Sequence, residues 1–279
     1  MKILLTGASS FVTKSLIIKL LNDDHDIIAI SRSKGYQKKK IKIHKHNLNI
    51  QKLNYSIWED VKCVIHLANV NNNSDNDPAK NLKILKNLIE GMPNTVEKFI
   101  FISSQMIYGN PNKTNINENH DIDPFYSNYS LGKFLCEKYL IQNKHIIKNN
   151  LIILRISGFV DSKKSLMFKM IDKIKNQKNI VLYNHGKTYR DYLFLDDLHN
   201  VIKKILNKDI NLKQKTYIFN LSSIQNCSLL TLAEKIKKKF QSKSKIILSN
   251  RNEIRSSFSF NINLIKKKLK FNPKNISNL

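Results

Sequence analysis

The chain has 279 residues, of which 41% are apolar, so it can bury a sizeable core and is not disordered. Its formal net charge of +27 first suggests a nucleic acid or an anionic membrane surface as a partner. However, only five of the 48 basic residues are Arg, and the Lys residues are spread along the chain among abundant Ile and Asn. We therefore interpret the charge as a solvated basic surface that helps to collect an anionic ligand. We expect no nucleic-acid or membrane partner.

The cysteines and histidines do not suggest a metal or disulfide framework. Cys63, Cys136 and Cys227 lie in apolar segments without Cys-x-x-Cys spacing, which indicates buried thiols in a reducing compartment. His44 and His46 have no accompanying carboxylate or Cys, so no metal site is expected. The N-terminal apolar run is too short for a signal peptide, and no apolar stretch approaches about 18 residues. The protein is accordingly expected to be soluble and cytoplasmic.

The first 30 residues predict a nucleotide-binding unit. An apolar strand at 2–5 leads through a turn at 6–10 into helical apolar spacing from Val12, and a second strand follows at 26–30. In such a unit a pyrophosphate rests on the backbone N–H groups at which the helix begins. Gly7 is present in the turn, but the second and third glycine places hold Ser10 and Thr13. Taken alone, this turn is weak evidence for a nucleotide.

The residues after the second strand bear on which dinucleotide would fit. An acidic residue there would accept a hydrogen bond from the ribose 2′-hydroxyl of NAD, whereas a basic residue tolerates the 2′-phosphate of NADP. The stretch reads Ser31-Arg32-Ser33-Lys34. It favours NADP over NAD, and the alternative interpretation is an arginine exposed on a loop.

Strands and helices alternate along the rest of the chain. The first part has predicted strands at 42–48, 61–67, 99–103 and 151–156, helices at 78–91 and around Tyr129, and a flexible surface connection at 110–124. Beyond Ser157 the pattern predicts helices at 165–176, 194–205, 229–240 and 262–269, and strands at 180–183, 216–221 and 245–248. Asp196 and Asp197 fall where a helix begins, so we interpret them as caps that favour the helix dipole.

The stretch from Phe99 to Lys133 holds the candidate chemistry. A buried strand ends in the hydroxyls of Ser103 and Ser104, and the following helix carries Tyr129 and Lys133, which share one face because they are four residues apart. A positive neighbour lowers the pKa of a phenol. Two other pairs, Tyr36/Lys40 and Tyr183/Lys187, have the same spacing. The position after a Ser-Ser strand end is what singles out Tyr129.

Several ordered motifs resemble the extended short-chain dehydrogenase/reductase family, also called the NAD-dependent epimerase/dehydratase family, which contains nucleotide-sugar epimerases, dehydratases and reductases. They cover nearly the whole chain and are TGASSFVT, Asn47-Leu48, HLAN, Asn81, FISSQMIYG, YSLGK, Arg155 and RDYLFLDD. The resemblance implies an α/β fold, a doubly wound parallel-sheet Rossmann domain with a smaller C-terminal α/β substrate domain. The expected domains are 1–156 plus 190–222 for NAD(P) and 157–189 plus 223–279 for a nucleotide sugar.

The resemblance also implies roles for individual residues. Tyr129 would be the acid/base, Lys133 would contact the nicotinamide ribose and lower the pKa of Tyr129, and Ser104 would hydrogen-bond the reacting oxygen. Arg190 and Arg251 would grip the substrate diphosphate, with Arg255 as the rival for the second place. The implied cofactor-binding residues are Gly7, Ser10, Phe11, Val12, Ser31, Arg32, Asn47, Leu48, Leu67, Ala68, Asn69, Ser103, Tyr129 and Lys133, and the implied substrate-binding residues are Ser104, Gln105, Arg190 and Arg251.

Departures from the family pattern narrow the expected activity. Asn47 and Gly158 stand where the family has Asp and often Asn. Family dehydratases carry an Asp-Glu pair after the active hydroxyl, and decarboxylating members carry a Glu; here Gln105 and Met106 occupy these places, and neither can titrate.

Two branches of the family remain. The Ser31-Arg32 pair favours a dissociable NADPH, and hence a reductase acting on a nucleotide-linked 4-keto(-6-deoxy) sugar. The alternative is a nucleotide-sugar 4-epimerase with retained NAD, and a minor alternative is a non-catalytic NAD(P)-sensing protein. By family analogy a homodimer is possible.

Overall fold

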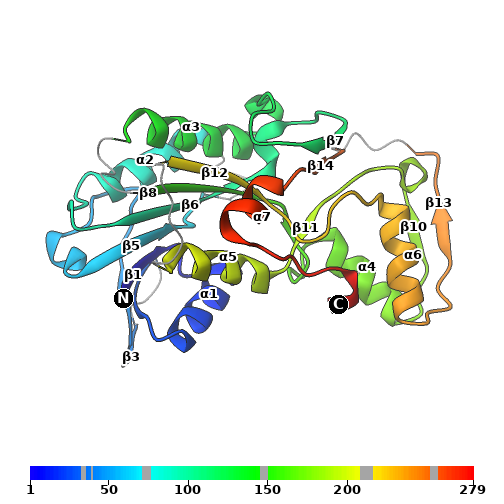
Figure 1. Cartoon of the computed structure of the whole chain (residues 1–279), viewed down its shortest axis with the longest axis horizontal. Helices are drawn as coiled ribbons and strands as arrows, with labels where there is room; N and C mark the ends of the chain where they lie inside the picture. The colour runs from blue at the N-terminus through cyan, green and yellow to red at the C-terminus, as the bar shows by residue number, and fades with distance from the viewer. Residues whose placement is uncertain (33–35, 39, 71–76, 145–149, 208–215, 252–256) are drawn as a thin grey trace. The chain divides into compact units, whose positions relative to one another are not determined.

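The computed structural model describes residues 1–32, 36–38, 40–70, 77–144, 150–207, 216–251 and 257–279 (Figure 1). The chain forms two compact units. The first contains Met1–Ile107, Asp123–Arg155 and Ile205–Phe219, and the second contains Tyr108–Ile122, Ile156–Lys204 and Asn220–Leu279. The division into a cofactor domain and a substrate domain stays a prediction. No described helix combines the length and the apolar character needed to cross a membrane.

An eight-stranded sheet dominates the first unit. Its strand order is β12-β8-β6-β5-β1-β2-β4-β3. The neighbouring pairs from β6 to β4 are parallel, and the short edge strand β3, which the sequence did not predict, is antiparallel to β4. The strands are β1 (Lys2–Thr6), β2 (Asp26–Ser31), β3 (Tyr36–Lys38), β4 (Ile41–Lys45), β5 (Val61–His66), β6 (Lys98–Ser104), β8 (Asn150–Ile156) and β12 (Thr216–Leu221). The predicted doubly wound α/β class is thereby confirmed.

The helices of this unit begin at caps that the sequence supplies. Ser10 caps α1 (Phe11–Asn22), Asp77 caps α2 (Pro78–Ile89) with proline at its first position, and a Ser127–Ser130 capping box begins α3 (Asn128–Gln142). Short 3₁₀ turns lie at η1 (Tyr55–Trp58), η2 (Gln105–Tyr108) and η3 (Pro124–Tyr126). The helices α2 and α3 pack against each other.

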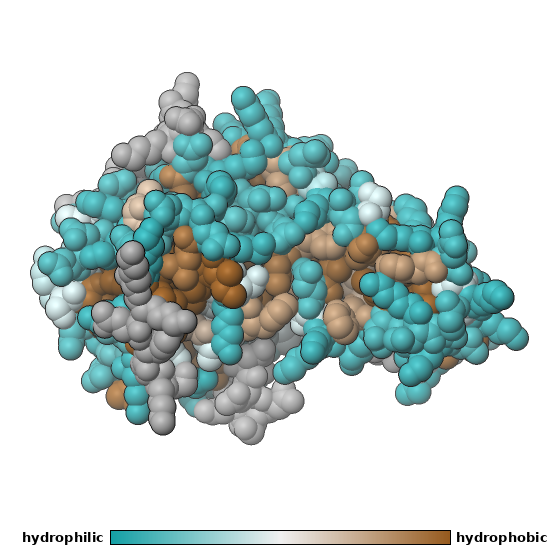
Figure 2. All heavy atoms as spheres, turned by 90° about the horizontal axis from the view of Figure 1, so that it is seen from below, coloured by the Kyte–Doolittle hydropathy of each residue, from teal (hydrophilic) through white to brown (hydrophobic). Residues whose placement is uncertain are grey.

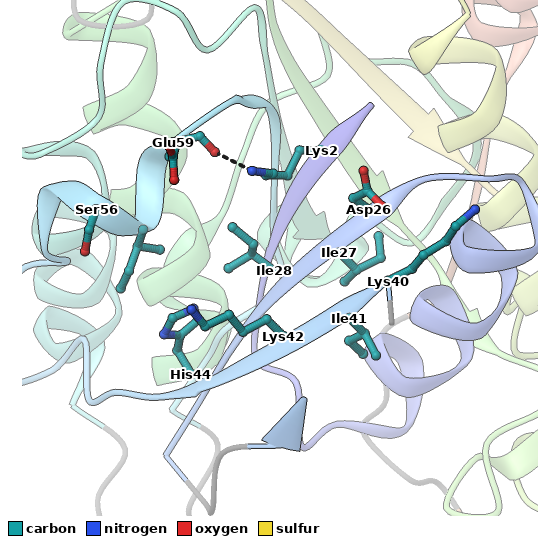
Figure 3. A pocket seen from close by; sticks show the side chains of 11 residues that line it. Lys2, Asp26, Ile27, Ile28, Lys40, Ile41, Lys42, His44, Ser56 and Glu59 are labelled. Carbon is teal, nitrogen blue, oxygen red and sulfur yellow. Dashed lines mark hydrogen bonds between the residues drawn. The ribbon is translucent and has the colours of Figure 1, made fainter. Parts of the chain in front are cut away.

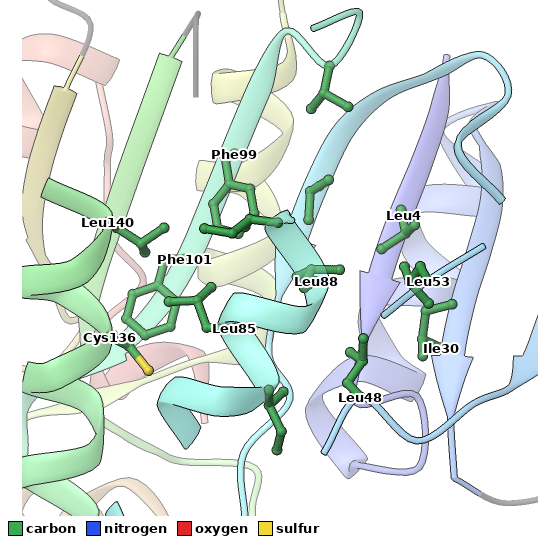
Figure 4. Packing of buried hydrophobic residues seen from close by; sticks show 14 of the residues in the cluster. Leu4, Ile30, Leu48, Leu53, Leu85, Leu88, Phe99, Phe101, Cys136 and Leu140 are labelled. Atoms are coloured by element: carbon green, nitrogen blue, oxygen red, sulfur yellow. The ribbon is translucent and has the colours of Figure 1, made fainter. Parts of the chain in front are cut away.

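One face of the sheet contributes to a shared hydrophobic core in this unit. Figure 4 shows side chains of α2 and α3 meeting strand residues. Phe99 and Phe101, two apart on β6, are buried at 0% and 1% exposure and share one face because side chains alternate along a strand. Ile100 lies between them and is also fully buried, so both faces of β6 are covered.

The chain order places a topological switch between β1 and β5. The chain adds β2 and β4 on one side of β1 and then returns to add β5 and β6 on the other side. In open parallel sheets, ligands bind outside the carboxyl ends of the strands at such a point. The residues that follow β1 and β5 therefore lie where the sequence predicts the cofactor.

The second unit combines small parallel pairs of strands with helices. Residues of α4, α6 and β10 supply much of its core, including Met167, Leu182 and Leu232. The pairs are β10 (Ile180–Leu182) with β13 (Ile246–Leu248), β11 (Tyr192–Leu193) with β9 (Gly158–Phe159), and β14 (Phe258–Phe260) with β7 (Lys113–Ile116). Its helices are α4 (Leu166–Lys175), α5 (Leu195–Leu206), α6 (Leu229–Lys239) and α7 (Asn263–Leu269), with η4 (Asn184–Gly186) and η5 (Ile276–Asn278).

The structure tests two predictions about these elements, the flexible connection at 110–124 and the caps Asp196 and Asp197. The prediction of a flexible connection at 110–124 is wrong for residues 113–116, which form β7 and bury Ile116 beside β14. As predicted, Asp196 and Asp197 lie in the first turn of α5. Asp197 does more than cap, because its carboxylate also accepts hydrogen bonds from Ser223 Oγ at 2.5 Å and Lys274 N at 2.8 Å.

The thiols and the surface agree with the composition. Cys63, Cys136 and Cys227 are buried and free of disulfides, as predicted. On the face seen in Figure 2, hydrophilic side chains cover most of the visible surface of the described residues.

Candidate active site

The carboxyl ends of β1 and β5 are joined by one hydroxyl. Thr6 Oγ1 accepts hydrogen bonds from Leu67 N at 3.2 Å and Ala68 N at 3.0 Å. Its own proton is then directed to His66 Nδ1, 2.8 Å away, so His66 carries its proton on Nε2. Burial, followed by the charge of Lys133, lowers the pKa of His66 to about 3. His66 is therefore a neutral core histidine with a hydrogen-bonded Nδ1.

The turn after β1 requires its one glycine. Gly7 has a φ of +78°, and a Cβ added there would lie 3.0 Å from Ala68 N. The two lost glycine places have structural uses instead. Ser10 Oγ accepts a hydrogen bond from Thr13 N at 3.1 Å and caps α1, while Thr13 is fully buried.

The start of α1 fits a dinucleotide pyrophosphate. Among the described residues, no acceptor bonds the backbone N–H groups of Phe11 and Val12, which are the first two residues of the helix. Free N–H groups and the helix dipole at this end favour an anion. These are two of the predicted cofactor-binding residues, so this part of the chain fits NAD(P).

The other predicted cofactor residues flank this turn. Arg32 follows β2 and is exposed, while Ser31 and Leu48 are buried. Asn47 Oδ1 accepts from Asn49 N at 3.1 Å, which closes the turn after β4. Asn69 follows Ala68 and is half-buried.

Ser104 and Tyr129 meet at the end of β6. Ser104 Oγ accepts from Met106 N at 3.2 Å and is hydrogen-bonded to the Tyr129 side chain. Burial raises the pKa of Tyr129, and the hydrogen bond from Ser104 acts in the opposite direction. Ser103 is buried at the same strand end. The structure thus brings the predicted hydroxyl and phenol together.

Lys133 is buried on the same helix as Tyr129, with 4% exposure. Its ammonium donates to Ile102 O at 2.8 Å and lies 5.0 Å from the centroid of the Phe101 ring. Burial lowers the pKa of Lys133 to about 8. In this structure burial raises the pKa of Tyr129 and a strand carbonyl accepts a hydrogen bond from the ammonium, so the lowering of that pKa by Lys133 stays a prediction.

A buried ion pair beside Lys133 was not predicted from the sequence. Arg155 Nη2 donates to Glu137 Oε2 at 2.8 Å, and the two side chains are 3% and 2% exposed. Glu137 lies four residues after Lys133 on α3, and its charge raises the pKa of Lys133. The sequence signal was available, since a carboxylate at this spacing shares a helix face with Lys133.

The predicted substrate arginines belong to the second unit. Arg190 is half-buried, directly before the buried Asp191. Arg251 is exposed, and its guanidinium carbon lies 5.7 Å from the centroid of the Tyr183 ring. Arg255, together with Ser33 and Lys34, lies outside the described residues.

A separate hollow contains none of the predicted site residues. It is lined by the first residues of β1 and β2, by β4 and by η1, including Lys2, Asp26, Lys42 and His44 (Figure 3). Because Lys2 and Asp26 begin their strands, this hollow extends from the amino ends, whereas the candidate site lies at the carboxyl ends. We do not assign it to the active site.

The chain is similar to known proteins over most of its length. The model of the NAD dependent epimerase/dehydratase family matches residues 3–221. A putative UDP-glucose 4-epimerase of Methanocaldococcus jannaschii is 26% identical over 257 residues, covering 84% of this chain and 81% of that protein. The dTDP-4-dehydro-6-deoxyglucose reductase of Escherichia coli is 26% identical over 272 residues, covering 88% and 83%.

A solved structure shows the same fold. The UDP-glucuronic acid 4-epimerase of Bacillus cereus, in complex with UDP-glucuronic acid and NAD, superposes with a TM-score of 0.77 at 19% identity, covering 98% of this chain and 94% of that one. The family model spans well over half of the chain. The protein therefore belongs to the NAD dependent epimerase/dehydratase family, the extended short-chain dehydrogenase/reductases, and is one of its enzymes.

Proposed function

We propose that this enzyme is a nucleotide-sugar 4-epimerase that uses a retained NAD. The observation that carries the proposal is the Ser104–Tyr129 hydrogen bond at the end of β6, with the buried ammonium of Lys133 on the same helix. This set of groups can move one proton at a carbinol oxygen while the hydride moves at the adjoining carbon. Tyr129 is the proposed acid/base and Ser104 and Lys133 its partners.

The chain's own residues divide the proton chemistry between them. NAD, when bound, supplies the hydride acceptor and a positive charge that favours the phenolate. Tyr129 Oη takes the proton of the sugar hydroxyl, and Ser104, whose Oγ already accepts from Met106 N, donates to the same oxygen. Lys133 adds a positive charge at the end of β6. In the return direction Tyr129 gives the proton back to the same oxygen, and the face of the sugar ring that receives the hydride sets the configuration at that carbon.

The residues after Ser104 favour plain hydride transfer. A dehydration also needs groups that remove and return protons beside the carbonyl. Gln105 and Met106 follow Ser104 in η2, and neither side chain titrates. We therefore do not propose a dehydratase.

Known proteins support the epimerase over the reductase that the sequence favoured. The relatives with matching length include the archaeal putative UDP-glucose 4-epimerase. The reductase remains the second candidate because Arg32 follows β2 and one relative is a reductase. NADP as cofactor depends on the same residue, whose exposure also fits a plain surface arginine.

Two assays separate the candidates. The purified protein is first denatured, and the released nicotinamide is identified; an epimerase carries NAD. The folded protein is then incubated with UDP-glucose and without added cofactor, and formation of the 4-epimer is followed by chromatography. Consumption of NADPH with a nucleotide-linked 4-keto-6-deoxy sugar, and no epimer from several UDP-sugars, would instead establish the reductase.

Tyr129→Phe tests the mechanism directly. The variant lacks the proton that must move, so we expect kcat to fall by about 100-fold or more, with cofactor binding kept. Tyr55→Phe is the matched control, because Tyr55 is 78% exposed and should leave the rate unchanged. Unchanged turnover in Tyr129→Phe would rule out the mechanism. Absence of turnover in the wild type, with cofactor still bound, would favour the NAD(P)-sensing alternative.

A further inference from the structure

Asp191 is a buried carboxylate in the second unit that the proposed chemistry does not use. It is 3% exposed, and it directly follows Arg190. Its Oδ1 accepts from Ser259 Oγ at 2.7 Å, and its Oδ2 accepts from Phe260 N at 2.7 Å. The backbone N–H of Asn226 is a third hydrogen-bond partner. Two separate chain segments therefore converge on one carboxylate.

Further contacts join the segment of Asp191 with the segments of Asn226 and Ser259. Asn226 N also donates to Ser259 Oγ at 2.8 Å, and Tyr189 N donates to Ser257 Oγ at 3.1 Å. Residues 189 and 192 form bridges with residues 228 and 224. The strand β14, which carries Ser259, is itself paired with β7. The segment that holds Arg190 is thus fixed on one side by 224–228 and on the other by 257–260.

Burying an ionisable group costs desolvation free energy, so packing alone does not explain why a carboxylate joins these segments. Burial raises the pKa of Asp191 to about 7, and its three hydrogen bonds oppose this effect. Replacing buried charged groups with apolar side chains of similar volume is often neutral or stabilising. A carboxylate, however, accepts from two donors in fixed directions, which defines the position of the backbone more narrowly than apolar contact does.

Asp191 lies close in the chain to one predicted diphosphate ligand and bonds the strand that follows the other. Arg190 precedes it in the chain, and β14 is the strand that follows the segment of Arg251. Arg251 has a second support, because Asn184 N donates to its carbonyl oxygen at 3.1 Å and its guanidinium lies over Tyr183. One predicted diphosphate ligand therefore directly precedes the carboxylate in the chain, and the other precedes the strand that the carboxylate bonds.

We propose that Asp191 is a positioning residue for the substrate diphosphate: its carboxylate holds the Arg190 segment against β14, so that Arg190 and Arg251 face one diphosphate. This inference rests on the proposed function, since it needs a nucleoside diphosphate group on the substrate. Asp191 itself does not touch the substrate.

Asp191→Asn tests the inference at about pH 8, where the wild-type carboxylate is ionised. Asn keeps the size of the side chain but offers one acceptor oxygen, so either Ser259 or Phe260 loses its partner. UDP and dTDP are titrated calorimetrically. We expect the Kd for the nucleotide that the wild type binds to rise about 10-fold, which corresponds to about 1.4 kcal/mol. We also expect KM for the sugar substrate to rise while kcat stays unchanged.

Two controls separate positioning from folding. Asp196→Asn removes another carboxylate of the same unit, one that is 45% exposed and paired with Lys274, and it should leave the Kd unchanged. If Asp191→Asn does not fold, Ser259→Ala removes a single donor, and we expect a smaller rise in the Kd, about threefold. A merely structural role would lower the melting temperature without this split between KM and kcat.

Failure of this inference and failure of the proposed function give different results in these experiments. An unchanged Kd in a folded Asp191→Asn, or equal losses of kcat and affinity, overturns the positioning role and leaves the proposed function intact. Failure of the wild type to bind either nucleoside diphosphate overturns the proposed substrate class together with this inference.

Discussion

The proposed mechanism requires Lys133 to stay charged although its burial disfavours charge. Its side chain is 4% exposed, and burial lowers its pKa to about 8, against the opposing charge of Glu137. The hydrogen bond to Ile102 O and the Phe101 ring face stabilise the ammonium that remains. The neutral state of His66 on the neighbouring strand avoids a second positive charge at this edge.

The pH dependence of activity and stability should therefore run in opposite directions. The proposed mechanism uses the ammonium of Lys133, so we expect kcat/KM to fall as pH rises through about 8. The pKa of Lys133 in the folded chain is below its ordinary value of 10.5, so the unfolded chain binds more protons between these values. The free energy of unfolding should accordingly rise by up to about 3 kcal/mol between about pH 8 and pH 10.5.

Denaturant unfolding over this pH range, with the matched variant Lys133→Met, checks the assignment. The variant lacks the titrating group, so its stability should not show this rise. A parallel rise in wild type and variant would assign the pH dependence to other groups, and a fall of activity that tracks unfolding would contradict the role of Lys133.

At the scale of the elements, α1 shows how a changed cofactor turn stays folded. Ser10 stands in a glycine place, yet it is a favourable cap whose Oγ takes the N–H of Thr13. The cap occupies an N–H donor, and the predicted pyrophosphate would compete with the Ser10 side chain for it. Helix stability and cofactor affinity are thus opposed at this residue.

Ser10→Gly should reveal this opposition. Glycine is nearly as good a cap, so the free energy of unfolding should fall by only a few tenths of a kcal/mol, about 0.3. With the N–H of Thr13 released, we expect NAD to bind about threefold to tenfold more tightly, measured by calorimetry on cofactor-free protein. Ser9→Gly, in the exposed part of the same turn, is the control and should change neither quantity. Weaker binding by Ser10→Gly would show that the hydroxyl itself contacts the cofactor.

The elements that the sequence predicted are those with a local signal. The strands β1, β5 and β6 are mainly apolar, and α2 has a capping residue and helical apolar spacing, so their bounds agree with the predicted ranges within a few residues; α3 lies where a helix around Tyr129 was predicted. The strands β7 and β14 were not predicted. Lys113–Ile116 is polar and Asn-rich, and it becomes a strand through pairing with Phe258–Phe260, a contact about 140 residues away that no local pattern encodes.

At the scale of the whole molecule, the site was predicted in its parts but not in its electrostatics. The fold places Ser104 and Tyr129 in contact, as the order of the motifs suggested, and it also puts Gly7 beside Ala68. The direction of the pKa of Tyr129 and the ion pair of Glu137 with Arg155 depend on burial, which spacing cannot measure. The preference for a reductase relied on the Ser31-Arg32 pair after β2, and whole-chain similarity favours the epimerase instead.

The net charge of +27 should act on the rate of substrate capture rather than on the fold. Nucleotide sugars are anionic, so a basic protein attracts them over a distance that salt shortens from about 20 Å at 20 mM to about 7 Å at 200 mM. We expect kcat/KM to fall several-fold across this range while kcat at saturating substrate stays constant. Charge-reversing three exposed lysines of the second unit that are not predicted site residues, Lys169, Lys173 and Lys178, should flatten the salt dependence partly, and the matched Lys→Arg changes should leave it as in the wild type. A kcat/KM that does not vary with salt would show that the lysines form a solvated surface with no part in capture.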